Sequence, residues 1–355
     1  MKKRFVKDIK EKDHVSDSFL VTRKEIGMSK SGKPYLNLKI MDSTGEIEAR
    51  VWEDAEAKSK EFNKDDVAAI KGFAVAYQGG VQVNITDISR VPEGDYSIRD
   101  FLPASSKKPA EMMAELDSIV SGMKDAHLKA LLTSIFKDPG VRGRFMLAPA
   151  AKAMHHPYLG GLLEHVLSMC GLADKVSAHY GESVNMDLLK AGAILHDIGK
   201  IYELSYKRSF DYTDEGRLLG HITIGIELMD AHTRGVDGFP RDLSVLLRHM
   251  ILSHHGHLEF GSPKRPKTLE AIILYFLDDL DAKVAAVRSL IGPAEAGEGG
   301  GNWTPYQRIF ERPIFKGKAM NRPDYGEGRD NAGKDDSKAA SAKEVEEMTL
   351  FKKDN

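Results

Sequence analysis

Residues 35–52 read YLNLKIMDSTGEIEARVW, two runs of alternating apolar and polar side chains joined by a short polar turn. Successive side chains of a β-strand point to opposite faces, so a period of two indicates a strand that is buried on one face. The intervening residues Asp42–Gly45 are typical of a hairpin turn. We therefore predict two antiparallel strands, whose core-facing side chains are Leu36, Leu38, Ile40, Ile47, Ala49 and Val51.

The alternation extends from Phe19 to about Ile88, with further turns at residues 31–34 and 78–80. Between the third and fourth predicted strands, the charged segment Glu53–Phe62 has the composition of a helix. Five strands with one helix after the third is the layout of the OB-fold, a small β-barrel. We therefore predict an N-terminal five-stranded OB-fold β-barrel over residues 1–95.

Helical periodicity replaces this alternation after a linker-like segment, Pro103–Pro109. The second domain is therefore predicted to be an all-α helical bundle. Its expected helices are Ala110–Ser121, Ala126–Lys137, Gly161–Tyr180, Asp187–Ile198, His221–His232, Arg241–His255 and Thr268–Ile291. We divide the rest of the chain into a linker and helical connector at 96–149, the helical domain at 150–292, a C-terminal extension at 293–316 and a charged tail at 317–355, for which we predict disorder.

The composition is that of an ordinary globular protein, with 41% hydrophobic and 29% charged residues in a chain of 355. The net charge is −2, from 51 basic and 53 acidic residues, so no overall field attracts nucleic acid or an anionic membrane. The single cysteine, Cys170, excludes an internal disulfide and a cysteine-rich zinc site. No apolar run is as long as a membrane span or a signal peptide requires. We expect a cytoplasmic protein without a membrane partner, and the sequence leaves the oligomeric state open, a homo-oligomer included.

Histidine and aspartate side chains interrupt the apolar helices. A single histidine in such a helix is more often a core residue with a hydrogen-bond partner than a ligand. Burying many such groups without partners costs several kcal/mol apiece, so a shared partner is expected. Imidazoles and carboxylates without thiolates suit manganese, iron, cobalt, nickel or zinc. The sequence therefore predicts a metal centre formed by His165, His196, Asp197, His221, His254, His255 and an aspartate of the acidic cluster 278–281.

Seven ligands are too many for one ion that keeps positions open for substrate. Two ions that share the carboxylate of Asp197 would account for all seven ligands. Two metals about 3.5–4 Å apart are a standard device for phosphoester hydrolysis, because one activates water and both stabilise charge on the phosphoryl oxygens. Lys200, three residues further on, either neutralises phosphoryl charge or interacts with a helix C-terminus. Asp197 and Lys200 are therefore the predicted catalytic residues.

The order and adjacency of these residues resemble a known signature. His165, the run His196–Lys200 and the acidic cluster are similar to the motif of HD-domain metal-dependent phosphohydrolases. The additional histidines at 221, 254 and 255 resemble the two-metal branch of that family.

A narrower resemblance covers about residues 5–315. The segments His155–His165, Leu277–Lys283 and Trp303–Tyr306, together with the preceding OB-fold, resemble the YhaM-type 3′-to-5′ exoribonucleases. Spacing alone does not choose between Asp278 and Asp281, which are neighbours on one helical face. The resemblance implies Asp278 as the ligand, manganese as the activating ion and digestion from the 3′ end.

OB-folds bind single strands through a basic groove and aromatic side chains on which bases stack. The candidate nucleic-acid-binding residues on the non-core face and in the neighbouring turn are Lys30, Lys33, Tyr35, Lys39, Arg50 and Trp52. Residues 1–95 hold 17 basic and 17 acidic side chains, which predicts weak, salt-sensitive binding. Trp52 alternatively packs on the following helix. Near the first metal ligand, Lys152, His155 and His156 either contact substrate phosphate or belong to an ordinary loop.

These features together predict a metal-dependent 3′-to-5′ exoribonuclease that acts on single-stranded RNA, with single-stranded DNA as a further candidate substrate. The alternative enzyme is an HD-type phosphodiesterase or nucleotidase for a small nucleotide, and the OB-fold argues against it. An alternative of another class is a single-strand-binding, replication-associated factor with a structural metal site. A missing ligand would indicate such a factor, and the sequence supplies every expected ligand.

Overall fold

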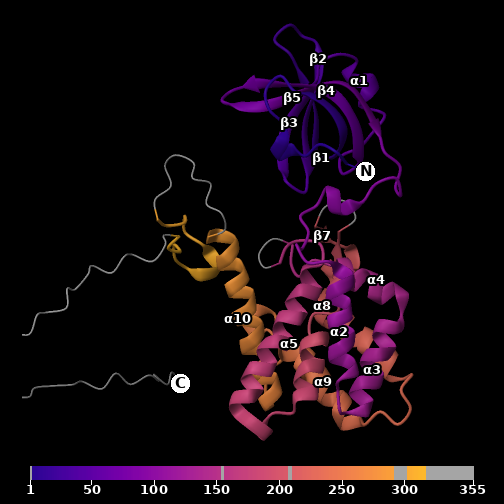
Figure 1. Cartoon of the computed structure of the whole chain (residues 1–355), viewed down its shortest axis with the longest axis vertical. Coiled ribbons are helices and arrows are strands. Elements are labelled where there is room, and N and C mark those ends of the chain that lie inside the picture. Colours follow the sequence, from indigo (N-terminus) through magenta and orange to yellow (C-terminus); the bar gives the residue numbers. More distant parts are fainter. Residues whose placement is uncertain (1, 153–155, 207–209, 292–301, 317–355) are drawn as a thin grey trace, which may run out of the picture. The chain divides into compact units, whose positions relative to one another are not determined.

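The computed structural model describes residues 2–152, 156–206, 210–291 and 302–316. The chain divides into two compact units, Met1–Pro293 and Ala294–Asn355. The first unit contains a β-barrel and a helical bundle (Figure 1). None of the described helices combines the length and apolar character needed to cross a membrane. The tail 317–355, for which the sequence predicts disorder, lies outside the described residues.

The β-barrel has the strand order β1-β2-β3-β5-β4 and is closed by pairing of β1 with β4. Strands β3 and β5 run parallel, and the other neighbouring pairs are antiparallel. A helix lies between the third and fourth strands, so the predicted OB-fold is confirmed. The strands are β1 His14–Met28, β2 Pro34–Asp42, β3 Gly45–Val51, β4 Val67–Tyr77 and β5 Gly80–Arg90, and the helix is α1 Ala55–Lys58.

The period-two pattern of residues 35–52 decides which side chains fill the barrel. Leu36, Leu38, Ile40, Ala49 and Val51 are fully buried in one hydrophobic cluster inside the barrel. Their polar neighbours in sequence point outward, as the alternation of strand side chains requires. The predicted core of these two strands is therefore confirmed.

The helix expected at Glu53–Phe62 is much shorter in the structure, where α1 covers only Ala55–Lys58. Beyond it, the ammonium group of Lys24 donates hydrogen bonds to the carbonyl oxygens of Ser59 and Phe62, at 2.6 and 2.5 Å. The Phe62 side chain enters the barrel core and is 1% exposed. A tertiary contact that helical composition does not reveal therefore ends the helix early.

The helical bundle contains nine described helices, several of which Figure 1 labels. The bounds of α3 and α5 agree with the prediction, and α2, α9 and α10 differ by one or two residues. The short helices α4 and α7 were not expected. The elements are α2 Pro109–Ser121, α3 Ala126–Lys137, α4 Pro139–Leu147, α5 Gly161–Tyr180, α6 Met186–Leu195, α7 Lys200–Glu203, α8 Asp214–Thr233, α9 Arg241–Ser253 and α10 Leu269–Ile291, with a two-stranded hairpin of β6 Leu204–Ser205 and β7 Asp211–Tyr212.

Two predicted helices end or bend where the candidate ligands lie. The helix expected to continue to Ile198 ends at Leu195, with His196 as its C-cap. Helix α8 begins seven residues before His221, but its backbone breaks at Gly220, where φ is +72°. These interruptions place ligand-type side chains at helix ends instead of in regular helical positions.

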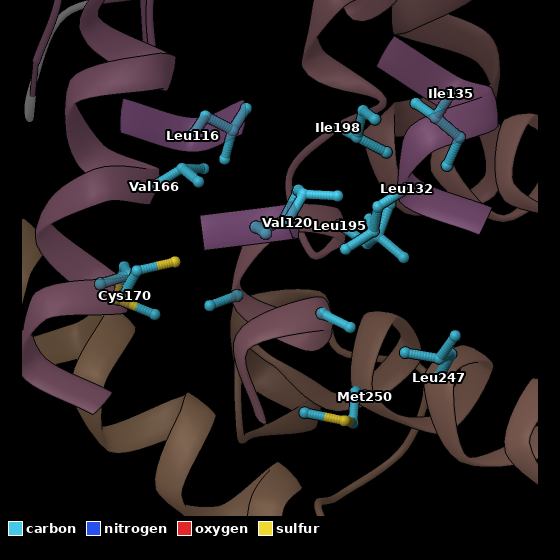
Figure 2. Close-up of a cluster of buried hydrophobic side chains, with 14 of the residues drawn as sticks. Leu116, Val120, Leu132, Ile135, Val166, Cys170, Leu195, Ile198, Leu247 and Met250 are labelled. Atoms are coloured by element: carbon cyan, nitrogen blue, oxygen red, sulfur yellow. The ribbon is translucent and has the colours of Figure 1, made fainter. Parts of the chain in front are cut away.

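One hydrophobic cluster joins the helices of the predicted connector to those of the predicted helical domain. Figure 2 shows Leu116 and Val120 of α2 and Leu132 of α3 in the same cluster as Val166 and Cys170 of α5. Large side chains that share one buried cluster are expected to fold cooperatively. We therefore infer that residues 109–291 form one helical body.

Candidate metal centre

The structure brings all seven predicted metal ligands together from five places in the bundle. His165 lies in α5, His221 in α8 and Asp278 in α10. His196 and Asp197 follow the end of α6, and His254 and His255 follow the end of α9. Among the described residues, three groups of ligand atoms lie within 4.8 Å of one another: a first group of His165, His196 and Asp278, a second group of His221, His254 and His255, and a third of His156, His165 and Asp281 on the Nδ1 side of His165.

The first group is more deeply buried than the second. The Nε2 atom of His165 lies 3.2 Å from Asp278 Oδ1 and 3.3 Å from His196 Nε2. The distance from His196 Nε2 to Asp278 Oδ1 is 3.7 Å. The imidazoles of His165 and His196 are fully buried. Two Nε2 atoms and one carboxylate oxygen thus face a common point.

Asp197 lies between the first group and the second group. Its Oδ2 atom is 3.3 Å from His196 Nε2, on the side of the first group. Its Oδ1 atom is 3.4 Å from His221 Nε2 and 3.6 Å from His254 Nε2, on the side of the second group. The two oxygens of one carboxylate therefore face different sets of imidazoles, the arrangement that a bridging ligand requires.

The Nδ1 atoms of four histidines are engaged by oxygen atoms of the protein. His196 Nδ1 is 2.9 Å from the carbonyl oxygen of Ala193, and His254 Nδ1 is 2.7 Å from that of Ile251. His221 Nδ1 is 3.0 Å from Glu203, and His165 Nδ1 is 2.7 Å from Asp281, each measured to a carboxylate oxygen. An Nδ1–H that donates to oxygen leaves the Nε2 lone pair for a metal. All four Nε2 atoms face the centre.

Four buried polar atoms of the centre have no hydrogen-bond partner among the described residues. Leaving a buried polar atom unpaired costs about 1–3 kcal/mol, so such atoms are rare unless a ligand satisfies them. A divalent cation accepts lone pairs from imidazole nitrogen and carboxylate oxygen together. The donor set therefore fits metal ions. The unpartnered atoms are Asp197 Oδ1, His221 Nε2, His254 Nε2 and His255 Nδ1.

The electrostatics of the centre also favour bound cations. Burial opposes charge on Asp197, but Lys200 and His196 outweigh it and hold the pKa of this carboxyl well below its ordinary value. Burial likewise opposes charge on His196, yet Asp197 raises the pKa of this imidazole to about 10, so positive charge is favoured at its Nε2 atom, and a bound metal ion would replace the proton there. Burial lowers the pKa of His255 to about 4, so this imidazole is neutral at pH 7. Fixed carboxylate charge and a neutral imidazole are suitable partners for a divalent ion.

Lys200 belongs to the same cluster. Its ammonium group lies 2.6 Å from Asp197 Oδ2, and the residue is 8% exposed. Burial opposes this charge, but Asp197 raises the pKa of Lys200 above its ordinary value. The ammonium therefore stays charged at the centre, where it pairs with Asp197. It helps to line a cavity of about 190 Å³ whose residues are Lys200, His254, His255, Phe260, Tyr275, Asp278, Asp279 and Ala282.

A glycine permits the close approach that assembles these parts. A Cβ atom on Gly199 would lie 2.0 Å from the carbonyl oxygen of His221, far inside contact distance. The turn after Asp197 and the second half of α8 therefore come together only because residue 199 has no side chain. Gly199 in this way sets the distance between Asp197 and His221.

Two carboxylates beside the ligands hold histidine rings: Glu203, which the sequence analysis missed, and Asp281, which it considered only as an alternative metal ligand. Glu203 Oε1 accepts hydrogen bonds from both the backbone N–H and the Nδ1–H of His221, each at 3.0 Å. Asp281 Oδ2 contacts His165 Nδ1, whereas Asp278 lies on the Nε2 side of the same ring. The sequence offers one signal for Glu203, because this acidic residue closely follows the apolar residues of the segment His196–Lys200. In the structure Glu203 is 8% exposed.

The loop residues before the first ligand are placed differently from one another. Both ring nitrogens of His156 are engaged, by the hydroxyl of Tyr158 at 2.6 Å and by Asp281 at 3.1 Å. Lys152 is exposed and forms an ion pair of 2.9 Å with Asp211. His155 lies outside the described residues. A substrate contact by His156 would therefore require it to give up a protein partner.

The barrel carries an aromatic cluster built around Arg50. The rings of Tyr35 and Trp52 are stacked with centroids 4.8 Å apart, and Trp52 remains 45% exposed. The Arg50 guanidinium lies 5.3 Å from the Tyr35 ring and 5.1 Å from that of Tyr77, a residue that the sequence analysis missed. Trp52 stacks on Tyr35 and stays exposed. It is therefore better described as an outward-facing aromatic residue than as one that packs on α1.

The lysines predicted for this face differ in their surroundings. Lys30 and Lys33 are exposed in the turn between β1 and β2. Lys39 instead forms an ion pair with Glu46. Lys33 and Trp52 line a hollow that also contains three acidic side chains, Glu53, Asp54 and Glu56. Three carboxylates make that hollow unfavourable for phosphate.

Comparison with known proteins identifies the family. Residues 162–283 match the HD domain family, and residues 20–91 match the family described as OB-fold nucleic acid binding domain. The 3′-5′ exoribonuclease YhaM of Geobacillus sp. (strain WCH70) is 36% identical over 298 residues, which are 83% of this chain and 90% of the relative. The chain belongs to the YhaM family.

A second YhaM exoribonuclease, from Bacillus velezensis (strain DSM 23117 / BGSC 10A6 / LMG 26770 / FZB42), is 34% identical over 287 residues, 81% of this chain and 90% of the relative. Among solved structures, the second OB-fold domain of replication protein A from Methanococcus maripaludis covers 26% of this chain and 98% of its own, with 18% identity and a TM-score of 0.22. That score is too low to support a functional argument. The two family matches, at residues 20–91 and 162–283, confirm the predicted order of an OB-fold barrel followed by a helical HD domain.

Proposed function

We propose that this protein is a metal-dependent 3′-5′ exoribonuclease that hydrolyses single-stranded RNA at the HD centre. One observation carries the proposal: seven histidine and aspartate side chains converge in the bundle of a chain that belongs to the YhaM family. Direction and RNA preference come from the names of the relatives, because the geometry of a metal centre fixes neither.

Two divalent ions fit the donor set. His165, His196 and Asp278 would hold the first, His221, His254 and His255 the second, and Asp197 would contribute one oxygen to each. Asp278, on the Nε2 side of His165, fits the ligand role better than Asp281, on the Nδ1 side. Bound ions supply an activated water and stabilise charge on the phosphoryl oxygens. Manganese is the proposed ion, and iron, cobalt, nickel and zinc suit the same donors.

The protein's own groups orient and balance this centre. Glu203 and Asp281 fix the rings of His221 and His165 through Nδ1, which keeps both Nε2 atoms directed inward. Lys200 holds Asp197 in place and presents a positive charge to the cavity. A buried cation beside the reacting phosphoryl group stabilises its charge more effectively than one in water. Asp197 and Lys200 remain the proposed catalytic residues.

The barrel is proposed to hold the RNA strand near the bundle. Tyr35, Trp52 and Tyr77 offer rings for base stacking, and Arg50, Lys30 and Lys33 offer charge for phosphates. Lys39 is neutralised by Glu46 and contributes less. Single-stranded DNA is a further proposed ligand, because stacking does not distinguish the two sugars. Binding here raises the local concentration of substrate at the metal centre.

The alternatives have less support. A cavity that opens beside the ligands is what a catalytic site needs, whereas structural metal sites are closed by protein ligands. A small-nucleotide phosphodiesterase would have no use for the aromatic cluster on the barrel. The proposed location is the cytoplasm, consistent with Cys170 as a buried free thiol.

The test is a time course with a 5′-labelled single-stranded RNA, run with manganese and with excess chelator. We expect a ladder that shortens from the 3′ end with manganese and an intact strand with chelator. The Asp197→Ala variant should leave RNA intact while still binding it through the barrel. Undiminished digestion by this variant, or an intact strand with folded, manganese-loaded wild-type protein, would contradict the proposal.

A further inference from the structure

The loop that connects the metal centre to α10 contains exposed groups that the roles above leave unused. Residues 256–268 read GHLEFGSPKRPKT and follow His254 and His255 directly. The loop contains the 3-10 turn Leu258–Phe260 and then three cations, Lys264, Arg265 and Lys267. Neither the motif of the HD centre nor the aromatic cluster of the barrel includes any of them.

Phe260 is the aromatic residue of this loop that borders the cavity of the metal centre. Its side chain is 67% exposed and lines the cavity together with Lys200 and His255. The ring meets that of His257 edge-on, with centroids 5.5 Å apart. One face of Phe260 therefore stays accessible beside the reacting groups. Exposing a large aromatic ring has a cost in free energy, and stacking on a nucleobase recovers it.

The fold fixes this loop in place. Gly256 has φ of +77°, and a Cβ atom there would lie 2.2 Å from the ring of Tyr275, so the turn packs directly on α10. Ser262 is 2% exposed and donates a hydrogen bond of 2.9 Å to the carbonyl oxygen of Leu252. The backbone N–H of Lys267 donates to His249 Nε2 at 2.9 Å. The exposure of Phe260 is therefore a property of an anchored turn.

The cations after the turn are available for a ligand. Lys264, Arg265 and Lys267 are exposed, and none of them forms an ion pair with an acidic side chain in the described ranges. The loop has a single acidic residue, Glu259, so it carries a positive charge in a chain whose net charge is −2. Unpaired cations in the same short loop as an exposed aromatic ring are a combination that binds single-stranded nucleic acids.

We propose that the loop 256–268 is a second binding site for single-stranded RNA, at which Phe260 stacks on the 3′-terminal nucleobase and Lys264, Arg265 and Lys267 contact phosphates. The inference rests on the proposed function, because it assumes that a strand end enters the cavity. It gives the HD centre a reason to act on single strands: a base must be unpaired to stack on Phe260. The loop thereby binds the terminal base of the RNA, whereas the barrel binds another part of the strand.

The first test compares the wild type, Phe260→Ala, Phe260→Trp and the control Leu258→Ala on two RNAs, one of which lacks the 3′-terminal base. Leu258 is 55% exposed in the same turn but does not line the cavity. We expect Phe260→Ala to raise KM for the intact RNA roughly 10-fold or more, since a stacked base contributes that much. The wild type and Phe260→Trp should prefer the RNA with the terminal base, and Phe260→Ala should lose this preference.

A second test addresses the cations. We expect Lys264→Ala to lower the slope of log KM against log salt by about 0.7, the effect of one phosphate contact on a single strand. The exposed Lys175 of α5 provides a matched control, and Lys175→Ala should keep the wild-type slope.

The outcomes separate the two proposals. If the wild type digests RNA but Phe260→Ala behaves like Leu258→Ala on both strands, the loop does not bind the terminal base and the inference is wrong. If the wild type, folded and loaded with manganese, leaves RNA intact, the proposed function itself fails, whether or not the protein hydrolyses bis(4-nitrophenyl) phosphate. Equal slopes of log KM against log salt for Lys264→Ala and Lys175→Ala would show that Lys264 does not contact a phosphate.

Discussion

Glu203 offers a sharp test of how the centre holds its second ion. In Glu203→Gln the Oε1 atom can still accept both hydrogen bonds from His221, which are 3.0 Å long in the structure, so the geometry is kept and only the charge is lost. Hydrogen bonds to charged acceptors are about twice as strong as neutral ones, and the partner of a ligating histidine raises its basicity. We expect manganese affinity at the site of His221, His254 and His255 to fall about 10- to 100-fold, or roughly 1.4–2.8 kcal/mol.

The assay is competition with a fluorescent chelator on the full-length chain, analysed for two classes of binding site. The wild type should show both classes, and Glu203→Gln should weaken the class formed by His221, His254 and His255 more than the class formed by His165, His196 and Asp278, which shares with it only the Asp197 carboxylate. Glu215, exposed in the first turn of α8, provides the matched control Glu215→Gln, which should bind as the wild type does. Unchanged binding by Glu203→Gln, or equal weakening of both classes, would refute the reasoning.

Three further predictions concern other parts of the molecule. Lys200→Met should lower kcat about 100-fold or more with little change in RNA affinity, because the ammonium acts on phosphoryl charge; stopped-flow hydrolysis and filter binding measure the two quantities. Trp52→Ala should weaken binding of single-stranded RNA by about 1–3 kcal/mol, whereas Phe73→Ala, which removes an aromatic residue 41% exposed on the same barrel, should not; fluorescence anisotropy decides between them. Leu132→Ala in α3 should destabilise the protein by about 2–5 kcal/mol and shift a single helical unfolding transition. A separate early transition for residues 109–149 would show that these helices fold independently.

The parts of the fold that could be predicted are those encoded by local periodicity. Leu36, Leu38 and Ile40 alternate with polar residues because one face of their strand is buried, and this pattern survives in any barrel that the strand joins. The bounds of α3 and α5 were predicted to the residue because each has an apolar stripe with clear stop signals. The shortening of α1 was not predictable, since it depends on Lys24, more than 30 residues earlier in the sequence.

The candidate site divides in a similar way. Its ligands stand out in the sequence because histidine and aspartate are conspicuous on apolar helices. Glu203 and Asp281 do not stand out as partners, because their roles depend on which ring nitrogen they face. Tyr77 of β4 reaches Arg50 of β3 only after β5 pairs with both strands, so the order of strands in the sheet creates that contact. Lys39 illustrates the opposite error, since a cation that seemed free is paired across the hairpin with Glu46.

The central claim is that Asp197 joins two metal ions in one hydrolytic centre. The most direct measurement follows RNA hydrolysis as manganese is added back to metal-free protein, with bound metal per chain determined on the same samples. The account predicts two bound ions per chain, full activity only when both are present, and loss of activity together with bound metal in Asp197→Ala. Full activity with one ion per chain, or in the metal-free protein, would contradict it.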